Sequence, residues 1–325
     1  MLYLDGLHRS KSKSSIILLT GASGFIGKSF LNHALSLGLR VRVLARQPNE
    51  WPSKAGFEVV EGDFSVQSDW SRVLEGVQVV VHLAAEIADT ALMPAVNVLG
   101  PERLLKAAVN LGVKRWVQLS SVGSYGPIMS GLVSEDQPDK PSDAYELSKS
   151  DFDKILKKMA RYHGIEVCIV RPSNVYGPGM SNQSIQEMLN AIRKNLFAFI
   201  GPAGASANYV HVQDVIQALY LCVFHPKAAN QTFIVSAWAT IEEMASGLAA
   251  GAELKAPGRR IPIGVAILIA TIMQWWPRWP LSLSRVQAMS VRSRYSTKKI
   301  EKELGWKLTV PVKKGMREFA RDSRK

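Results

Sequence analysis

Apolar runs that suit β-strands alternate with stretches of helical spacing along the first half of the chain. Strands are predicted where consecutive residues are mostly apolar and often β-branched, at 15–20, 39–45, 57–61, 77–83, 115–120 and 166–171. Helices are predicted where apolar residues recur every three to four positions, at 25–37, 101–111 and 145–163. Strands joined by helical crossovers indicate parallel βαβ units. The predicted fold class is therefore α/β, with a doubly wound parallel sheet.

This alternation weakens after residue 176, where proline and glycine become more frequent. We predict a flexible basic tail over 1–14, a sheet domain over 15–176 to which later segments return, and a smaller, mixed lobe over 177–325. Ligands of open α/β sheets bind beyond the carboxyl ends of the strands. The later lobe is therefore expected to bind mainly the substrate.

One apolar stretch of the later lobe, Ile261–Pro277, carries no charge and lies between two arginines. Its 17 residues are at the lower limit for a helix that spans a bilayer. We therefore predict a helix over 261–276 that packs against the lobe or touches a membrane face. Three neighbouring tryptophans suit either a membrane–water boundary or an oligomer contact: Trp275, Trp276 and Trp279.

The composition, with 47% hydrophobic and 21% charged residues, is that of a folded protein and excludes a disordered or collagen-like chain. The only two cysteines, Cys168 and Cys222, lie in apolar runs. No disulfide framework and no metal site is predicted, and a reducing compartment is indicated. The first residues do not have the pattern of a secretory signal. We therefore expect a cytoplasmic protein.

The net charge of +13 is unevenly distributed, because residues 278–325 hold fourteen basic and four acidic residues. This region suits an anionic membrane surface, a phosphate-bearing substrate or simply a solvated surface. No nucleic-acid-binding motif accompanies the charge, so nucleic acid is not an expected partner. Peripheral membrane contact and a homodimer both stay open.

The sequence TGASGFIG at 20–27 lies directly after the first predicted strand and opens the first predicted helix. Gly21 and Gly24 allow the backbone to turn tightly and approach a pyrophosphate, and Gly27 allows close packing of helix on sheet. The N–H groups at the start of the helix would then face the phosphates. This pattern predicts that 15–176 is a dinucleotide-binding Rossmann domain.

The residue that selects between NAD and NADP comes about 20 residues after the glycine loop. Here the second predicted strand is followed by Arg46, with no carboxylate to repel a 2′-phosphate. An arginine can pair with that phosphate and stack on the adenine. NADP(H) is therefore favoured, and NAD(H) remains the alternative if Arg46 is only a surface residue. Asp63 either contacts the adenine amino group or caps the turn that follows it.

Tyr145 and Lys149 lie one helical turn apart on the same face of a predicted helix. Such a pair can move a proton to or from an alcohol or ketone. The ammonium is expected to lower the pKa of the phenol from its usual value of about 10, and it can also hold a nicotinamide ribose. Ser120 and Ser121 end the fifth predicted strand, where a hydroxyl would point into the same cleft.

Several motifs occur in a characteristic order: TGASGFIG (20–27), VVHLAA (80–85), NVLGPERLLKAA (97–108), LSSVGSYG (119–126), AYELSK (144–149), VRPSNVYGPG (170–179) and YVHVQDV (209–215). With them the chain resembles the extended short-chain dehydrogenase/reductase family, which contains sugar-nucleotide epimerases, dehydratases and ketoreductases. The resemblance covers about residues 15–215 and, more weakly, 304–319.

The resemblance implies that Ser121 orients the substrate carbonyl, that Tyr145 is the general acid/base and that Lys149 is its partner. It places Asn97 on the helix behind the site and Arg171 in the loop that leads to the substrate pocket. Together, the motifs and the resemblance predict a cofactor site formed by Gly21, Ser23, Gly24, Phe25, Ile26, Gly27, Arg46, Asp63, Phe64, Leu83, Ala84, Ala85, Tyr145, Lys149, Pro172, Asn174 and Val175.

The chain departs from the family pattern at two positions. The acidic residue that selects NAD is absent, and Ala207 stands where the family usually has an arginine that grips the pyrophosphate of a sugar nucleotide. Either the substrate lacks a diphosphate or another arginine binds it; the candidates are Arg285, Arg292 and Arg294. The stretches 225–236 and 281–295 still resemble members that act in bacterial surface-polysaccharide synthesis.

The favoured interpretation is an NAD(P)-dependent oxidoreductase or epimerase. It would act on a hydroxyl or keto carbon of a nucleotide-linked sugar in polysaccharide biosynthesis, by hydride transfer with Tyr145 as acid/base. A reductase suits NADP(H), whereas an epimerase retains NAD. One alternative is a 3β-hydroxysteroid or other lipophilic alcohol dehydrogenase, which the missing arginine and the apolar stretch support. The other is a non-catalytic cofactor-binding regulator, against which the Ser–Tyr–Lys set argues.

Overall fold

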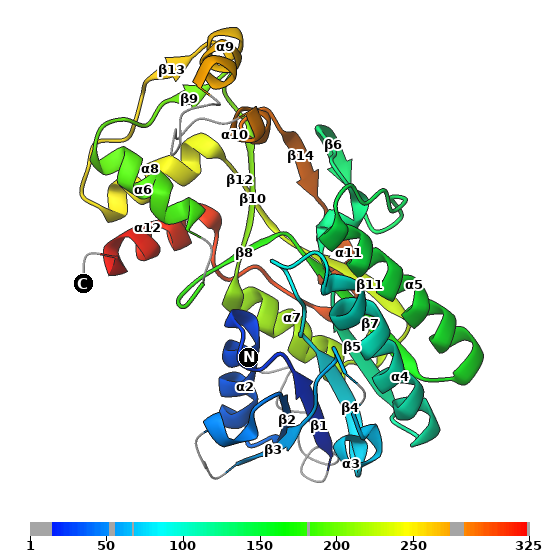
Figure 1. The fold of residues 1–325 in the computed structure, drawn as a ribbon. Coiled ribbons are helices and arrows are strands. Elements are labelled where there is room, and N and C mark those ends of the chain that lie inside the picture. Colours follow the sequence, from blue (N-terminus) through cyan, green and yellow to red (C-terminus); the bar gives the residue numbers. More distant parts are fainter. Residues whose placement is uncertain (1–14, 52–55, 67, 181–182, 274–282, 324–325) are drawn as a thin grey trace.

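The computed structural model describes residues 15–51, 56–66, 68–180, 183–273 and 283–323, shown as ribbons in Figure 1. The predicted basic tail at 1–14 and the three tryptophans at 275, 276 and 279 lie outside these residues.

Seven strands form the main sheet in the order β11-β7-β5-β4-β1-β2-β3. All neighbouring strands of this sheet are parallel. Their bounds are β1 Ile16–Thr20, β2 Arg40–Ala45, β3 Phe57–Glu61, β4 Val77–His82, β5 Arg115–Leu119, β7 Glu166–Pro172 and β11 Gln231–Val235. The predicted doubly wound α/β fold is confirmed, and each of the six predicted strands is found within one residue at either end.

The strand order reverses between β1 and β4. From β1 the sheet continues through β2 to β3 on one side, and from β4 through β5 and β7 to β11 on the other. Open α/β sheets bind their ligands in the crevice beyond the carboxyl ends of the strands at such a point. The glycine loop follows β1 and residues 83–86 follow β4, so both border this crevice.

Helices cover both faces of the sheet (Figure 1). One core cluster joins the sheet to α2 Phe25–Ser36, α7 Val212–Phe224 and α11 Lys298–Leu304. A second cluster on the opposite face contains side chains of α3 Trp70–Leu74, α4 Gly100–Asn110 and α5 Ala144–His163. Alternating residues of β1 supply the two layers, with Leu19 on the first and Leu18 on the second. Short 3-10 turns lie at Pro48–Glu50 and Pro226–Ala228.

The second lobe is built from smaller sheets. One has the strand order β12-β10-β8, over Ala237–Thr240, Ser206–His211 and Asn174–Tyr176. Two further pairs join β13 Arg260–Ile261 to β9 Phe199–Ile200, and β14 Arg292–Tyr295 to β6 Ser130–Val133. A third core cluster holds side chains of α6 Ser184–Arg193, α8 Ile241–Gly251 and α12 Val312–Asp322. This lobe is mixed, as the sequence predicted.

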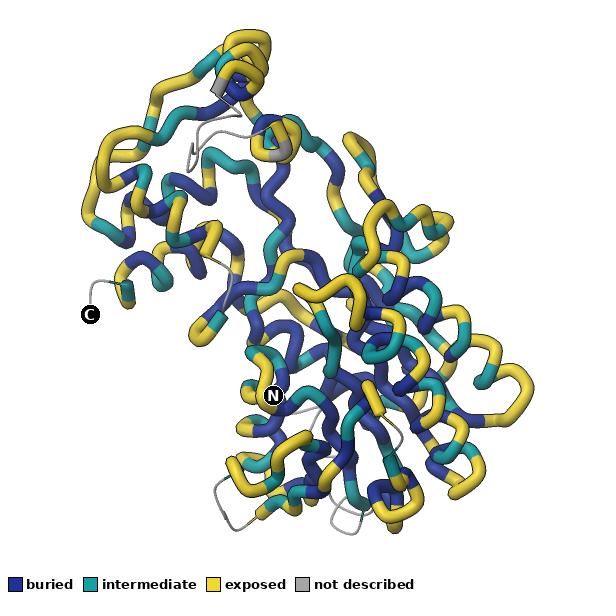
Figure 2. Tube along the Cα trace, viewed as in Figure 1, coloured by how far each residue is buried: buried dark blue, intermediate teal, exposed yellow. Residues whose placement is uncertain are grey.

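Helices α9 Ile263–Met273 and α10 Leu283–Ala288 form the end of this lobe that lies far from the main sheet (Figure 1). Ala266 and Ala270 are buried in a small cluster with Ile200 and Val286. Much of the remaining surface of α9 is exposed (Figure 2). The helix predicted at 261–276 is thus observed over 263–273. No helix within the described ranges is long and apolar enough to cross a membrane.

Candidate active site

The loop after β1 packs closely against the segment that follows β4. Gly21 has a φ of +70°, and a Cβ atom there would lie 2.5 Å from the Ala84 nitrogen. A Cβ atom on Gly27 would overlap the Gly21 carbonyl oxygen. Only glycine fits at these two positions. The loop ends at Gly24, the N-cap of α2, and the first N–H groups of a helix have no partner within it. This cradle fits the pyrophosphate of a dinucleotide.

Hydrogen bonds hold the ends of β1 and β4 together at this cradle. Thr20 Oγ1 lies 2.8 Å from His82 Nδ1 and accepts a hydrogen bond from the Ala84 nitrogen at 3.3 Å. The predicted cofactor residues Leu83, Ala84 and Ala85 therefore border the same crevice as Ser23, Phe25 and Ile26. Pro172 ends β7, and Asn174 and Val175 lie in β8. The loop after β8 reaches this place too, because a Cβ atom on Gly179 would lie 4.0 Å from the Phe25 ring.

At the adenosine end of the predicted cofactor site, Arg46 and Asp63 differ in their surroundings. Arg46 is exposed at the end of β2. The pKa of Glu86 is lowered mainly by backbone N–H groups, and to a smaller extent by the charge of Arg46. Arg46 therefore lies on the side of the crevice where residues 83–86 leave β4. Asp63 Oδ1 accepts hydrogen bonds from the Ser65 backbone nitrogen and hydroxyl, both at 2.8 Å. Asp63 thus caps its turn, and its adenine contact stays a prediction.

The ring of Phe64 does not face the crevice. It is stacked on Trp70 at a centroid distance of 5.5 Å and packs edge-on against His82 at 5.3 Å, within the second core cluster. The backbone of Phe64 packs against Gly100, where any side chain would overlap it. Phe64 therefore supports the crevice from the core and does not line it with its ring.

The three predicted catalytic residues lie just after the end of β5 and in the first two turns of α5. Asp143 caps α5 by accepting a hydrogen bond from the Glu146 nitrogen at 2.8 Å, which puts Tyr145 in the first turn. Lys149, one turn later, is only 4% exposed. Ser121 opens the 3-10 turn Val122–Tyr125 and accepts a hydrogen bond from the Gly123 nitrogen at 3.0 Å. A Cβ atom on Gly123 would lie 3.0 Å from the Glu146 side chain, so this turn packs on the first turn of α5.

The electrostatics of the pair differ from the sequence expectation. Burial, reinforced by the charges of Asp143 and Asp153, raises the pKa of Tyr145 to about 12. Burial lowers the pKa of Lys149 to about 8, and the charge of Asp153 opposes this decrease. The phenol pKa is therefore raised in the protein alone and not lowered as expected, because burial and the two aspartates all disfavour the phenolate. Tyr145 is a neutral phenol at neutral pH, which is the proton-donating form.

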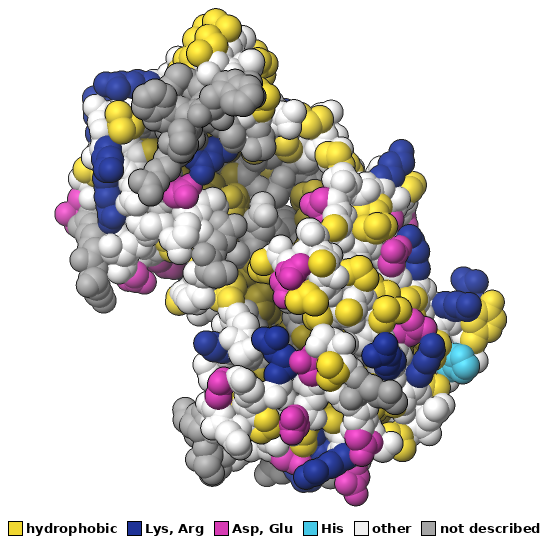
Figure 3. All heavy atoms as spheres, in the orientation of Figure 1, with side chains coloured by type: hydrophobic (Ala, Val, Ile, Leu, Met, Phe, Trp, Pro, Cys, Tyr) yellow, Lys and Arg dark blue, Asp and Glu magenta, His cyan; other side chains and the backbone are white. Residues whose placement is uncertain are grey.

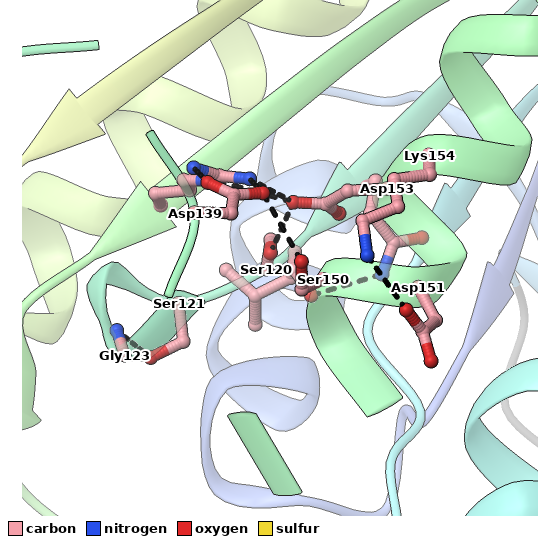
Figure 4. A network of polar contacts seen from close by, with 11 residues as sticks. Ser120, Ser121, Gly123, Asp139, Ser150, Asp151, Asp153 and Lys154 are labelled. Atoms are coloured by element: carbon pink, nitrogen blue, oxygen red, sulfur yellow. Dashed lines mark hydrogen bonds and ion pairs between the residues drawn. The ribbon is translucent and has the colours of Figure 1, made fainter. Parts of the chain in front are cut away.

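A buried ionic network lies behind this pair (Figure 4). Arg171 donates to the two oxygens of Asp139 at 2.7 and 2.9 Å and to Asp153 Oδ2 at 2.8 Å. Asp153 Oδ2 also accepts a hydrogen bond from Ser120 Oγ at 2.7 Å, and Ser150 Oγ donates to Asp139 at 3.1 Å. The placement of Arg171 in the substrate loop is therefore wrong: its side chain is 1% exposed and is held in the core by two carboxylates.

Asn97, which the resemblance placed behind the site, connects the crevice to the catalytic helix through Ser148, a residue that sequence reasoning missed. Asn97 lies in the π-helical turn Ala95–Leu99, where it accepts a hydrogen bond from the Glu86 nitrogen at 2.7 Å. Its Nδ2 donates to Ser148 Oγ at 3.0 Å, and Ser148 Oγ donates to the Tyr145 carbonyl oxygen at 2.8 Å. Asp153 was missed as well, although its spacing of four residues from Lys149 placed it on the same helical face.

A sequence profile of the NAD dependent epimerase/dehydratase family matches residues 17–236. This range contains the glycine loop, the Ser–Tyr–Lys set and all seven strands of the main sheet except one residue of β1. The chain belongs to this family. It is an enzyme of the extended short-chain dehydrogenase/reductase type, as the resemblance of its motifs implied.

The proteins to which this chain is similar have several different activities. The UDP-glucose 4-epimerase of Vibrio cholerae is 32% identical over 232 residues, which cover 68% of this chain and 70% of that enzyme. The 3beta-hydroxysteroid-dehydrogenase/decarboxylase isoform 2 of Arabidopsis thaliana is 26% identical over 289 residues, which cover 80% of this chain but 51% of that enzyme. The solved UDP-glucuronic acid 4-epimerase of Bacillus cereus in complex with NAD has a TM-score of 0.74, 18% identity and coverage of 95% and 100%, which shows the shared fold.

Ala207, at the position where the resemblance led us to expect a pyrophosphate-binding arginine, lies buried in β10. Arg285 is paired with Glu187 on the exposed side of α10. Arg292 and Arg294 belong to β14 instead, and Glu146 contributes to the raised pKa of Tyr295 at the end of that strand. Because Glu146 lies in the first turn of α5, β14 leads from the second lobe toward the catalytic helix.

Proposed function

We propose that this enzyme is an NAD(P)-dependent oxidoreductase or epimerase that acts on a hydroxyl or keto carbon of a nucleotide-linked sugar in polysaccharide biosynthesis. The proposal is supported by the position of Ser121 just after β5, by Tyr145 and the buried Lys149 one turn apart at the start of α5, and by the glycine cradle at the β1–β4 switch point of the same sheet. The sugar-nucleotide names of the Vibrio and Bacillus relatives support this substrate class.

The residues of the chain divide the proton chemistry between them. A bound nicotinamide dinucleotide supplies or accepts the hydride. Tyr145, whose pKa burial raises to about 12, donates its phenolic proton to the oxygen of a carbonyl that is being reduced. Ser121 orients that oxygen through its hydroxyl, and Lys149 holds the cofactor ribose and stabilises the phenolate that remains. We favour a reductase within the class, because the favoured cofactor NADP(H) is kept reduced in cells, whereas an epimerase retains NAD.

A diphosphate on the substrate requires cations in the second lobe. Arg294 lies 3.6 Å over the Trp238 ring, and Arg292 donates to the Pro202 carbonyl oxygen at 2.8 Å. Both arginines are held in place on β14 by these contacts. We assign them the phosphate contact that Ala207 cannot make.

NADP(H) is the cofactor that we favour, because Arg46 replaces the acidic residue that selects NAD. A charge-assisted hydrogen bond to the 2′-phosphate contributes about 1.5–3 kcal/mol, which corresponds to about a 10- to 150-fold preference. NAD(H) is the alternative, and the NAD complex of the Bacillus epimerase supports it. Cytoplasmic location and a homodimer also stay predictions.

A second candidate substrate is a 3β-hydroxysteroid or other lipophilic alcohol. The similarity to the Arabidopsis dehydrogenase/decarboxylase and the buried Ala207 favour it. A third candidate, a cofactor-binding regulator without activity, is disfavoured by the Ser–Tyr–Lys arrangement.

The test combines cofactor titration with a substrate panel. NADPH should bind about 10- to 150-fold more tightly than NADH, and Arg46→Ala should remove the difference. Arg40→Ala is the matched control, because Arg40 is an exposed arginine at the opposite end of the same strand. The panel contains UDP- and dTDP-linked 4-ketosugars, the corresponding alcohols and sterols. Turnover of a sugar nucleotide supports the proposal, turnover of sterols alone favours the second candidate, and cofactor binding without any turnover favours the third.

A further inference from the structure

We infer that helix α9, with the cations that flank it, docks on an anionic lipid bilayer, so that the enzyme is a peripheral membrane protein. The inference concerns the far end of the second lobe and does not depend on which substrate Tyr145 serves. It starts from the side chains that α9 presents to its surroundings.

The large apolar side chains of α9 face outward while its small ones face the protein. Ala266 and Ala270 are at most 1% exposed. Five larger side chains have exposed fractions from 41% to 64%: Ile263, Val265, Ile267, Leu268 and Ile272. Figure 3 shows hydrophobic side chains gathered at this end of the molecule. Contiguous apolar surface of this kind marks an interaction site for a protein or a membrane.

The distribution around the helix favours lipid over a second protein. At about 100° per residue, the five exposed apolar side chains spread over about 200° of the circumference of the helix. Ile263 lies at one edge of this arc and Val265 at the other. An apolar arc of this width beside cationic residues is typical of a helix that inserts its exposed sides into a membrane interface. Thr271, the one hydroxyl residue of this helix, donates its hydroxyl hydrogen bond to the Ile267 carbonyl oxygen at 2.9 Å and so needs no water.

The length of α9 sets the mode of contact. Its 11 residues extend about 16 Å, which is far short of the hydrocarbon core of about 30 Å. The helix therefore lies in the interface with its exposed sides among the acyl chains near the headgroups.

The surrounding charge matches an anionic surface. Between Leu254 and Val291, on either side of α9, the sequence contains five lysines and arginines and no acidic residue. Lys255, Arg259 and Arg260 are exposed just before α9, and Arg285 is exposed in α10. Arg260 and Arg285 pair with Glu242 and Glu187 from neighbouring helices. Arg259 donates to the Asn195 carbonyl oxygen, a neutral group, and so keeps its positive charge uncompensated there. Cations beside an apolar helix strengthen binding to anionic headgroups, and salt weakens that contribution.

The experiment is flotation of the full chain with vesicles of phosphatidylcholine alone or mixed with phosphatidylglycerol, at low and high salt. We expect flotation with the mixed vesicles at low salt and a marked loss at high salt. The double variant Leu268→Ser, Ile272→Ser changes the two most exposed side chains of α9 and should lower binding about tenfold or more. Lys255→Glu, Arg259→Glu should lower binding to the mixed vesicles only.

The matched control is Leu37→Ser, Leu111→Ser, which removes two exposed leucines from the Rossmann half and should float like the wild type. Unchanged NADPH binding shows that each variant is folded. Three results would overturn the inference: no flotation with the mixed vesicles at low salt, equal flotation of the α9 variant, or flotation that resists both salt and carbonate. A wild-type dimer that the α9 variant converts to a monomer, without flotation of either, would assign this surface to a second copy of the chain.

Discussion

The inner side of the catalytic helix and the far end of the second lobe both reverse the usual distribution of polar and apolar side chains. Beside α5, Lys149, Asp153 and Arg171 are charged groups with exposed fractions of 4% or less. In α9, isoleucine and leucine side chains are 41% to 64% exposed. The buried charges compensate one another inside the protein. The exposed apolar helix is compensated only by something outside it, so the first region serves chemistry and the second serves attachment.

The charge balance of the inner region includes the catalytic lysine. One guanidinium, Arg171, is shared by the carboxylates of Asp139 and Asp153. This leaves one excess negative charge, and the charges of Asp153 and Lys149 favour each other's ionised forms. Asp153 Oδ1, moreover, accepts no hydrogen bond from the part of the chain that the structure describes. Asp153 therefore takes part in the ion pair with Arg171 and also acts on the charge of Lys149.

The largest expected effect concerns the chemistry itself. Tyr145→Phe removes only the phenolic hydroxyl, so kcat should fall about 10²- to 10⁴-fold while cofactor affinity stays nearly unchanged. Lys149→Met should impair both, because Lys149 also holds the ribose. Steady-state kinetics and cofactor titration measure the two quantities. A Tyr145→Phe enzyme that keeps more than about a tenth of the wild-type rate would remove the acid/base role from this helix.

A smaller effect is expected on stability from two aspartates of the same helix. Asp153→Asn breaks a fully buried pair and should lower the free energy of unfolding by about 3–5 kcal/mol. Asp151→Asn is the control, because Asp151 pairs with the exposed Lys154 at 2.9 Å (Figure 4); it should change stability by less than about 1 kcal/mol. Denaturant titration measures both. Equal effects would mean that the ionic network adds no more than a surface pair.

The sequence was sufficient to predict the strands of the first half, because their apolar runs are bounded by glycine and polar residues. The glycine loop was equally recognisable, since Gly21 and Gly27 are positions where no other residue fits. The sequence did not predict which distant strands pair. β11 lies beside β7, and β14 beside β6 from more than a hundred residues earlier in the chain.

Of the two reversed regions, the sequence did not predict the buried charges, and it left the apolar helix with two possibilities, packing against the lobe or touching a membrane face. Asp153 and Arg171 look like ordinary charged residues in the sequence, and only the packing of α5 on β7 buries them together. An apolar run such as 263–273 normally indicates a buried helix. Its exposure depends on where the lobe ends in space, which a local pattern does not contain. The Tyr145 pKa was misjudged because burial, its largest cause, is also a property of the folded chain.

The smallest effect is a shift in pH dependence, and it tests whether Asp153 acts through Lys149. Burial lowers the pKa of Lys149 to about 8, Asp153 opposes this, and the neighbouring His82 is neutral because burial lowers its pKa well below the usual value. The ammonium is present below pH 8 and lost above it, so kcat/KM for reduction, which reports the free enzyme, should fall about fivefold between pH 8 and 9. Asp153→Asn removes the charge that favours the ammonium, so the fall should begin at a lower pH. Asp151→Asn should leave it in place. A profile that is flat to pH 10, or an equal shift in both variants, would separate the catalytic lysine from the buried network.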